Sequence, residues 1–151
     1  MANNDVTRIG VGVLVIRGDK YLLGKRIGAH EAGVYAAPGG HLEYGESFAE
    51  CARREVLEET GLVAGAVRFL LIGNYMFGTK HYVDVDLVVE CPDGEPIAME
   101  PEKCAEWKWY RFDELPSPVF IVTKRMIDAH LKGYNADTEA VENVLRPDAW
   151  R

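Results

Sequence analysis

Three glutamates, Glu55, Glu58 and Glu59, stand at positions i, i+3 and i+4 of a segment with the pattern of a helix. Because successive residues of an α-helix are turned by about 100°, the three side chains share one wall about 100° wide. Carboxylates crowded in this way raise one another's pKa unless a cation neutralises them. An all-oxygen ligand set favours Mg²⁺ or Mn²⁺ over Zn²⁺, so the spacing is typical of a divalent-metal site.

A plainer interpretation is a solvated helix face on which Arg54 pairs with Glu58 at i+4. The preceding residues favour the metal site, because Pro38-Gly39-Gly40-His41 is a glycine-rich loop that runs into the helix. Glycines permit close backbone approach, so such a loop can offer carbonyls to a metal and N–H groups to phosphate oxygens. The loop and the helix together predict a site for metal-assisted phosphate chemistry.

The window from residue 40 to 62 resembles the signature of the Nudix hydrolases, G-x5-E-x7-R-E-U-x-E-E-x-G-U, in which U is aliphatic. Seven fixed residue types would coincide by chance with a probability on the order of 10⁻⁸ per window. The flanking segments, residues 22–26, 38–43 and 99–109, are similar to those of the MutT-like nucleoside triphosphate pyrophosphohydrolases in this family. Every defined position of the signature matches: Gly40, Glu46, Arg54, Glu55, Val56, Glu58, Glu59, Gly61 and Leu62.

The resemblance implies Mg²⁺-dependent hydrolysis of a phosphoanhydride bond in nucleoside triphosphates, giving a nucleoside monophosphate and pyrophosphate, with Mn²⁺ as an alternative ion. One signature glutamate is expected to orient or deprotonate the attacking water, and Glu46 to brace the loop. The expected catalytic residues are Glu55, Glu58 and Arg54, where Arg54 anchors the carboxylates. The expected metal ligands are the Gly39 carbonyl, Glu55, Glu58, Glu59 and, from outside the signature, Glu102, with Glu100 as its substitute.

Substrate contacts are expected from four further residues. Lys25 and Arg26 supply positive charge for the polyphosphate, provided that the fold brings them to the site. By resemblance, His41 faces the phosphates and the Phe120 ring stacks on the base. Ile121 stands where related plant and animal enzymes tend to have tryptophan, and Ala36-Ala37 replace bulkier or polar residues. Both departures predict a wider, less selective base pocket.

Two other functions stay open at this point. A Nudix hydrolase can act on another nucleoside diphosphate derivative, such as a nucleotide sugar or a dinucleotide, although the sequence contains no obvious additional motif for NADH, coenzyme A or ADP-ribose. A binding module that has kept the fold and lost the chemistry is the other alternative. Such a module usually loses the signature glutamates, and here they are intact.

Length and composition indicate one domain over residues 1–151, since 151 residues with 48% hydrophobic content can bury a core. No amino-terminal signal and no apolar run long enough for a bilayer is seen, so we expect a cytoplasmic protein without membrane contact. The net charge of −7 disfavours a nucleic-acid surface and leaves a small nucleotide as the expected partner. A homodimer is kept as an alternative to a monomer. Cys51, Cys91 and Cys104 are expected to be reduced structural thiols.

The elements that position these residues follow from periodicity and from capping signals. Ser47 and Glu50 form a capping box, and Gly61 ends the first helix. A second helix is expected with Ser117 as its cap and Pro118 at N1, ending near Lys132-Gly133. Trp107 and Trp109 are expected in the core. Strands are expected at Ile9 to Ile16, Lys20 to Gly24, Val67 to Gly73, His81 to Glu90 and Glu106 to Phe112.

This order of elements predicts an α/β fold, and the resemblance implies the Nudix-type α/β/α sandwich, in which a mixed β-sheet lies between helices. The tail from Tyr134 to Arg151 is expected to hold a short helix over Ala140 to Leu145, and no role is assigned to it.

Overall fold

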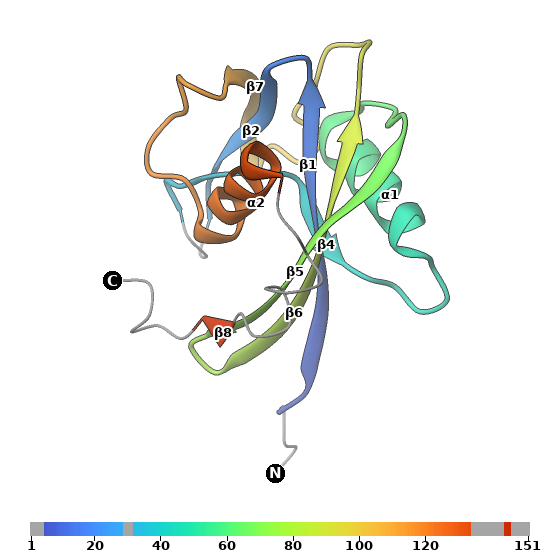
Figure 1. Ribbon diagram of the computed structural model, residues 1–151, viewed down its shortest axis with the longest axis vertical. Helices are drawn as coiled ribbons and strands as arrows, with labels where there is room; N and C mark the ends of the chain where they lie inside the picture. The colour runs from blue at the N-terminus through green and yellow to red at the C-terminus, as the bar shows by residue number, and fades with distance from the viewer. Residues whose placement is uncertain (1–4, 29–31, 134–143, 146–151) are drawn as a thin grey trace.

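The computed structural model describes residues 5–28, 32–133 and 144–145, and it shows a mixed sheet between two helices (Figure 1). The strands form one eight-stranded sheet in which β3-β2-β1-β6-β5-β8 are neighbours, while β4 pairs with β1 and β7 with β2. In chain order the elements are β1 (Thr7–Arg17), β2 (Lys20–Arg26), β3 (Tyr35–Ala36), β4 (Gly39–His41), α1 (Phe48–Thr60), β5 (Val67–Phe77), β6 (Lys80–Glu90), β7 (Cys104–Arg111), α2 (Ile121–Lys132) and β8 (Val144–Leu145).

The central strand β1 separates two apolar cores, because successive side chains of a strand point to opposite faces. Val11, Val13 and Val15 pack with Cys51, Ala52 and Val56 of α1. Leu14 and Ile16 pack on the other face with Val122, Met126 and Ile127 of α2. The helices therefore cover opposite faces of the sheet, and the predicted α/β/α sandwich is confirmed.

Strand β1 is also the backbone support of the glycine-rich segment. It pairs in parallel with β6 from Thr7↔His81 to Ile16↔Glu90. On its other side it pairs antiparallel with β4, where Gly12 lies opposite Gly39 and Val11 opposite Gly40. A side chain at Gly39 would overlap the Val11 carbonyl oxygen. Glycine is therefore required where the segment crosses β1.

The start and the end of α1 lie where the sequence predicts them. The Ser47 hydroxyl accepts a hydrogen bond from the Glu50 N–H (3.0 Å), and the Glu50 carboxylate accepts one from the Ser47 N–H (2.9 Å). Gly61 ends the helix in the left-handed region with φ 73°, and its N–H donates to the Leu57 carbonyl. Both ends of the helix are thus fixed by local sequence, and the three glutamates inherit a defined orientation.

Two short strands and the start of α2 differ from the expectation. Neither β3 nor β4, which lies in the glycine-rich segment, was predicted, because a strand of two or three residues is too short to show a periodic pattern. The second helix begins at Ile121 with Phe120 as its cap, so Ser117 and Pro118 are not its first residues. The reason is pairing with β3: the Tyr35 N–H donates to the Pro118 carbonyl (2.9 Å), and the Phe120 N–H donates to the Tyr35 carbonyl (2.8 Å). The helix end at Gly133 is as predicted.

The remaining elements agree in kind and differ in extent. Strand β5 continues to Phe77 beyond the expected Gly73, and β7 spans Cys104–Arg111. Trp107 and Trp109 pack against the α1-side core, as expected. Of the helix expected over 140–145, residues 140–143 lie outside the described residues, and Val144–Leu145 pair in parallel with β5 as β8. No helix in the described part of the chain is long and apolar enough to cross a membrane.

Candidate active site

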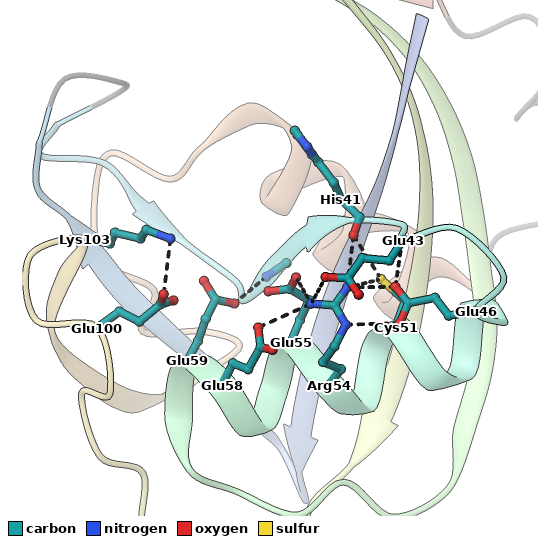
Figure 2. Close-up of polar contacts among 11 residues, drawn as sticks. His41, Glu43, Glu46, Cys51, Arg54, Glu55, Glu58, Glu59, Glu100 and Lys103 are labelled. Atoms are coloured by element: carbon teal, nitrogen blue, oxygen red, sulfur yellow. Dashed lines mark hydrogen bonds and ion pairs between the residues drawn. The ribbon is translucent and has the colours of Figure 1, made fainter.

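Arg54, in the middle of α1, is the centre of the polar network drawn in Figure 2. Its guanidinium donates to both carboxylate oxygens of Glu46, with Nε to Oε2 at 3.0 Å and Nη2 to Oε1 at 2.7 Å. Nη1 donates to Glu55 at 2.8 Å and to Glu58 at 3.3 Å. Nη2 also donates to the His41 carbonyl at 3.0 Å. Arg54 thus joins α1 to the segment that precedes it.

Glu46 holds the turn between β4 and α1. Its Oε1 accepts the Glu43 N–H at 2.8 Å as well as the Arg54 fork. The hydrogen bonds from Arg54 lower the pKa of Glu46 to about 2. This carboxylate is therefore ionised at every pH at which the protein works, which suits the structural role that the sequence predicts for it.

Glu59 is held differently from Glu46. Its Oε2 accepts the Gly39 N–H, at 2.9 Å, and its backbone carbonyl accepts the Trp107 indole N–H at 3.0 Å. Burial raises the pKa of Glu59 to about 8, and the charges of Glu55 and Glu100 add to this shift. Burial also raises the pKa of Glu55, although Arg54 opposes the shift. Among the described residues, Glu59 is therefore the one aligned carboxylate without an ion pair, since Arg54 pairs with Glu55 and Glu58.

Glu100, and not Glu102, lies close to these carboxylates. Its charge contributes to the raised pKa of both Glu55 and Glu59. Glu100 also forms an ion pair with Lys103, with Nζ to Oε2 at 3.2 Å, next to Glu59 in Figure 2. Glu102 is exposed and lines the neighbouring cavity. Glu100 thus lies beside the aligned carboxylates, whereas Glu102 lines the cavity that Glu59 also lines.

A cavity of about 880 Å³ opens beside Gly39 and Glu59 and reaches β6 and the start of α2. Of the residues expected to bind substrate, Arg26, His41 and Phe120 line it. Lys25 does not, because neighbours on a strand point to opposite faces: its Nζ lies 6.0 Å from the centre of the Tyr35 ring, in a separate small depression. The fold thus brings Arg26 to the cavity and leaves Lys25 outside it.

Aromatic rings form one wall of the cavity. Phe120 stacks on Phe77 with ring centres 5.8 Å apart and planes 28° apart, and the Arg26 guanidinium carbon lies 5.5 Å from the centre of the Phe120 ring. Phe77 also meets Tyr82 edge to face at 6.1 Å, and Tyr82 contacts the His41 ring at 5.6 Å. A flat ligand ring entering the cavity would thus meet a π-surface and a cation.

The donor set suits a hard divalent cation. The half-buried Glu59 carboxylate and its neighbours Glu55 and Glu100 provide oxygen ligands, and the charges of Glu55 and Glu100 both raise the pKa of Glu59. In the described part of the chain, no three His, Cys, Asp or Glu side chains converge as a ready-made metal cluster. Arg54 holds Glu55 and Glu58, and the Gly39 amide holds Glu59. A bound cation would therefore compete with these hydrogen bonds.

Asp84 and Asp86 of β6 are absent from the site predicted from sequence. Asp84 lines the cavity, and Asp86 directly behind it is fully buried. Neither carboxyl oxygen of Asp86 has a hydrogen-bond partner among the described residues. The signal in the sequence is the run Tyr-Val-Asp-Val-Asp-Leu-Val-Val, which puts two carboxyls on one face of an otherwise apolar strand.

The model of the NUDIX domain matches residues 6–130 of the chain. The NAD-capped RNA hydrolase NudC of Edwardsiella ictaluri (strain 93-146) is 30% identical over 118 residues, which cover 77% of this chain and 45% of NudC. The chain thus spans less than half the length of this curated relative. Among solved structures, the MutT NUDIX hydrolase from Burkholderia pseudomallei is 28% identical with a TM-score of 0.77, covering 82% of this chain and 98% of that chain. The MutT protein from Bacillus halodurans is 25% identical with a TM-score of 0.67 and 82% coverage of both chains.

Proposed function

Because this chain belongs to the Nudix hydrolase family, we propose that it is an Mg²⁺- or Mn²⁺-dependent hydrolase of nucleoside triphosphates, releasing a nucleoside monophosphate and pyrophosphate. The observation that carries the proposal is one cavity lined both by Gly39 and Glu59 and by the Phe120 ring. Such a cavity accommodates a phosphate chain near the carboxylates and a base near the ring.

The metal would be held by the Gly39 carbonyl, Glu55, Glu58 and Glu59, with Glu100 or Glu102 as a further carboxylate. A bound divalent cation neutralises charge on the phosphoryl oxygens and makes a bound water more acidic. The chain's own contribution is orientation. Arg54 keeps the side chains of Glu55 and Glu58 on the same side of α1, and one of the aligned glutamates orients the attacking water and takes its proton.

Arg26 and His41 supply polar groups to the cavity in this proposal. Both line the cavity, and the Arg26 guanidinium carbon lies 5.5 Å from the centre of the Phe120 ring. A guanidinium binds phosphate oxygens through paired N–H groups, so Arg26 suits a phosphate that lies beside a base stacked on Phe120.

A second candidate function is cleavage of a dinucleotide or of another nucleoside diphosphate derivative. The observation that favours it is the 30% identity to NudC, which is named a hydrolase of NAD-capped RNA. A cavity of about 880 Å³ lies within the usual range of ligand pockets and does not discriminate by size.

One panel separates the two candidates. Purified protein is assayed with nucleoside triphosphates, NADH, nucleotide sugars and NAD-capped RNA, with Mg²⁺, with Mn²⁺ and with EDTA, and the phosphate products are identified. We expect pyrophosphate from triphosphates only when a divalent ion is present. Efficient cleavage of NADH or a nucleotide sugar, together with inactivity on every triphosphate, would replace the first candidate by the second.

Phe120→Ala should raise KM for the nucleotide about five- to a hundredfold, since loss of one stacking ring is worth about 1–3 kcal/mol. Metal binding should be unchanged, because the ring is proposed to touch the base. Phe112→Ala, which removes an exposed ring beyond β7, is the matched control. Steady-state kinetics and thermal unfolding on the same preparations decide: a large loss of stability with unchanged KM would make Phe120 a packing residue of α2.

A further inference from the structure

Asp84 and Asp86 lie on the face of β6 that looks toward α2, where the neighbouring side chains are apolar. Burial raises the pKa of Asp84 to about 6 and that of Asp86 well above its ordinary value, and the charge of Asp84 raises the pKa of Asp86 further. Asp86 is the more deeply buried, so burial favours its uncharged form more strongly than that of Asp84. Asp84, at the cavity wall, is the carboxyl of the pair that a ligand can reach.

The sheet is built to accommodate both carboxyls. In the parallel pairing of β1 with β6, Gly10 lies beside Asp84 and Gly12 beside Asp86. A Cβ atom at Gly10 would overlap Asp84 Oδ1, and one at Gly12 would overlap Asp86 Oδ1. Each aspartate thus lies beside a glycine of β1, and its carboxyl occupies the space that a side chain at that glycine would need.

No described cation forms an ion pair with Asp84. Arg125 of α2 acts on Asp86 and lies against Tyr75, with Nη1 3.4 Å from the hydroxyl and the guanidinium carbon 5.7 Å from the ring centre. Arg26, Lys80 and Lys103 line the same cavity as Asp84. Removing a carboxylate from water without giving it a hydrogen-bond donor costs free energy. A ligand that donates hydrogen bonds to the carboxylate offsets this cost. Asp84 is therefore an acceptor positioned for a ligand.

The same wall of the cavity carries Phe77, Tyr82 and Phe120, whose rings are in mutual contact through Phe77. A base stacked there presents its edge, and not its face, to β6. We propose that Asp84 recognises this edge by accepting two hydrogen bonds from adjacent N–H groups and thereby selects guanine, in contrast to the less selective pocket that Ile121 and Ala36-Ala37 predict. The proposal rests on the proposed function, because it places the base of the substrate in this cavity.

The selection follows from donor patterns. Guanine offers a ring N–H and an amino group side by side, which match the two oxygens of one carboxylate. Hypoxanthine lacks the amino group, and adenine offers one amino donor beside a ring-nitrogen acceptor that repels a carboxylate. An asparagine amide, with one acceptor and one donor, matches adenine instead. Asp84→Asn should therefore change which base is preferred, in addition to weakening guanine binding.

The experiment measures binding of guanosine, inosine and adenosine monophosphates by calorimetry, and kcat/KM for the three triphosphates, for the parent and for three variants. The parent should favour guanine over hypoxanthine at least about tenfold, the lower range for one hydrogen bond to a charged group. Asp84→Asn should lose this preference and bind adenine better than guanine. Asp86→Asn, which keeps an uncharged side chain behind Asp84, should keep the guanine preference. Asp128→Asn, on the exposed face of α2, is the control and should match the parent.

Two results would overturn the inference: a parent that binds the three monophosphates equally, or an Asp84→Asn protein with the base ranking of the parent. Thermal unfolding confirms that each variant is folded. Monophosphate binding tests base recognition without cleavage. If triphosphates are not hydrolysed but guanine binding still depends on Asp84, the proposed function fails and the base assignment stands. If triphosphates are hydrolysed with no base preference, the base assignment fails alone.

Discussion

Glu59→Gln should lower kcat at least about a hundredfold and, in the absence of metal, should stabilise the protein. The loss of activity is expected because glutamine keeps the size of the side chain but removes a charged metal ligand or general base. Folding should survive, since the amide oxygen can still accept the Gly39 N–H. Glu90→Gln, a change at an exposed carboxylate, is the control. A variant whose turnover stays within a factor of three of the parent would remove Glu59 from the metal site.

The gain in stability follows from the raised pKa of Glu59. Between its ordinary value of 4.5 and about 8, the folded state binds more protons than the unfolded state. The stability of the metal-free parent therefore falls as pH rises through this range, and the deficit is complete above pH 8. In EDTA, urea unfolding should give the variant and the parent the same free energy of unfolding at pH 4. At pH 8.5 the variant should be more stable by about 2–4 kcal/mol, a value set below that of the full pKa shift because Glu59 is partly exposed. Mg²⁺ should stabilise the parent and not the variant.

Arg54→Lys should destabilise the protein by about 2–4 kcal/mol and lower kcat at least about tenfold. A lysine keeps the charge but has no fork, so it cannot serve Glu46, Glu55 and the His41 carbonyl together. We expect a smaller loss of stability than for a fully buried ion pair, because 23% of the Arg54 side chain is exposed. Arg53→Lys is the matched control, since Arg53 is exposed and donates only to the Gly65 carbonyl, at 3.2 Å.

The effect of Arg54→Lys should depend on pH. Arg54 lowers the pKa of Glu46 from 4.5 to about 2, so the stability that this carboxylate contributes is complete above pH 4.5 and is lost as pH falls toward 2. The parent and the variant should therefore differ most at neutral pH and converge near pH 2, as measured by urea unfolding. An equal difference at pH 7 and at pH 3 would show that Arg54 acts through packing of its aliphatic part.

Local signals in the sequence were sufficient for α1 and for the core strands. Ser47, Glu50 and Gly61 fix the ends of α1 through bonds within a few residues, so its carboxylate wall follows from spacing alone. The long strands follow from two patterns: β1 is a continuous apolar run that is buried on both faces of the sheet, whereas burial alternates along β5.

The errors concern contacts between distant segments. Pro118 and Phe120 form hydrogen bonds with Tyr35, some 80 positions away, and this pairing overrides the helix-start signal of Ser117. Lys25 and Arg26 are neighbours on β2 and point to opposite faces. The sequence alone does not tell which face borders the cavity, and the structure shows that it is the face of Arg26. Asp84 was missed because the sequence of a strand does not tell whether a carboxyl side chain faces solvent or a cavity.

The parallel pairing of β1 with β6 also constrains the order in which the chain folds. Thr7 and His81 meet across this ladder, 74 positions apart, so β1 lacks this partner until β6 has been synthesised. Contacts between residues so far apart in sequence form more slowly than local ones, such as the hairpin of β5 and β6. We therefore expect the pairing of β1 with β6 to form after that hairpin during folding.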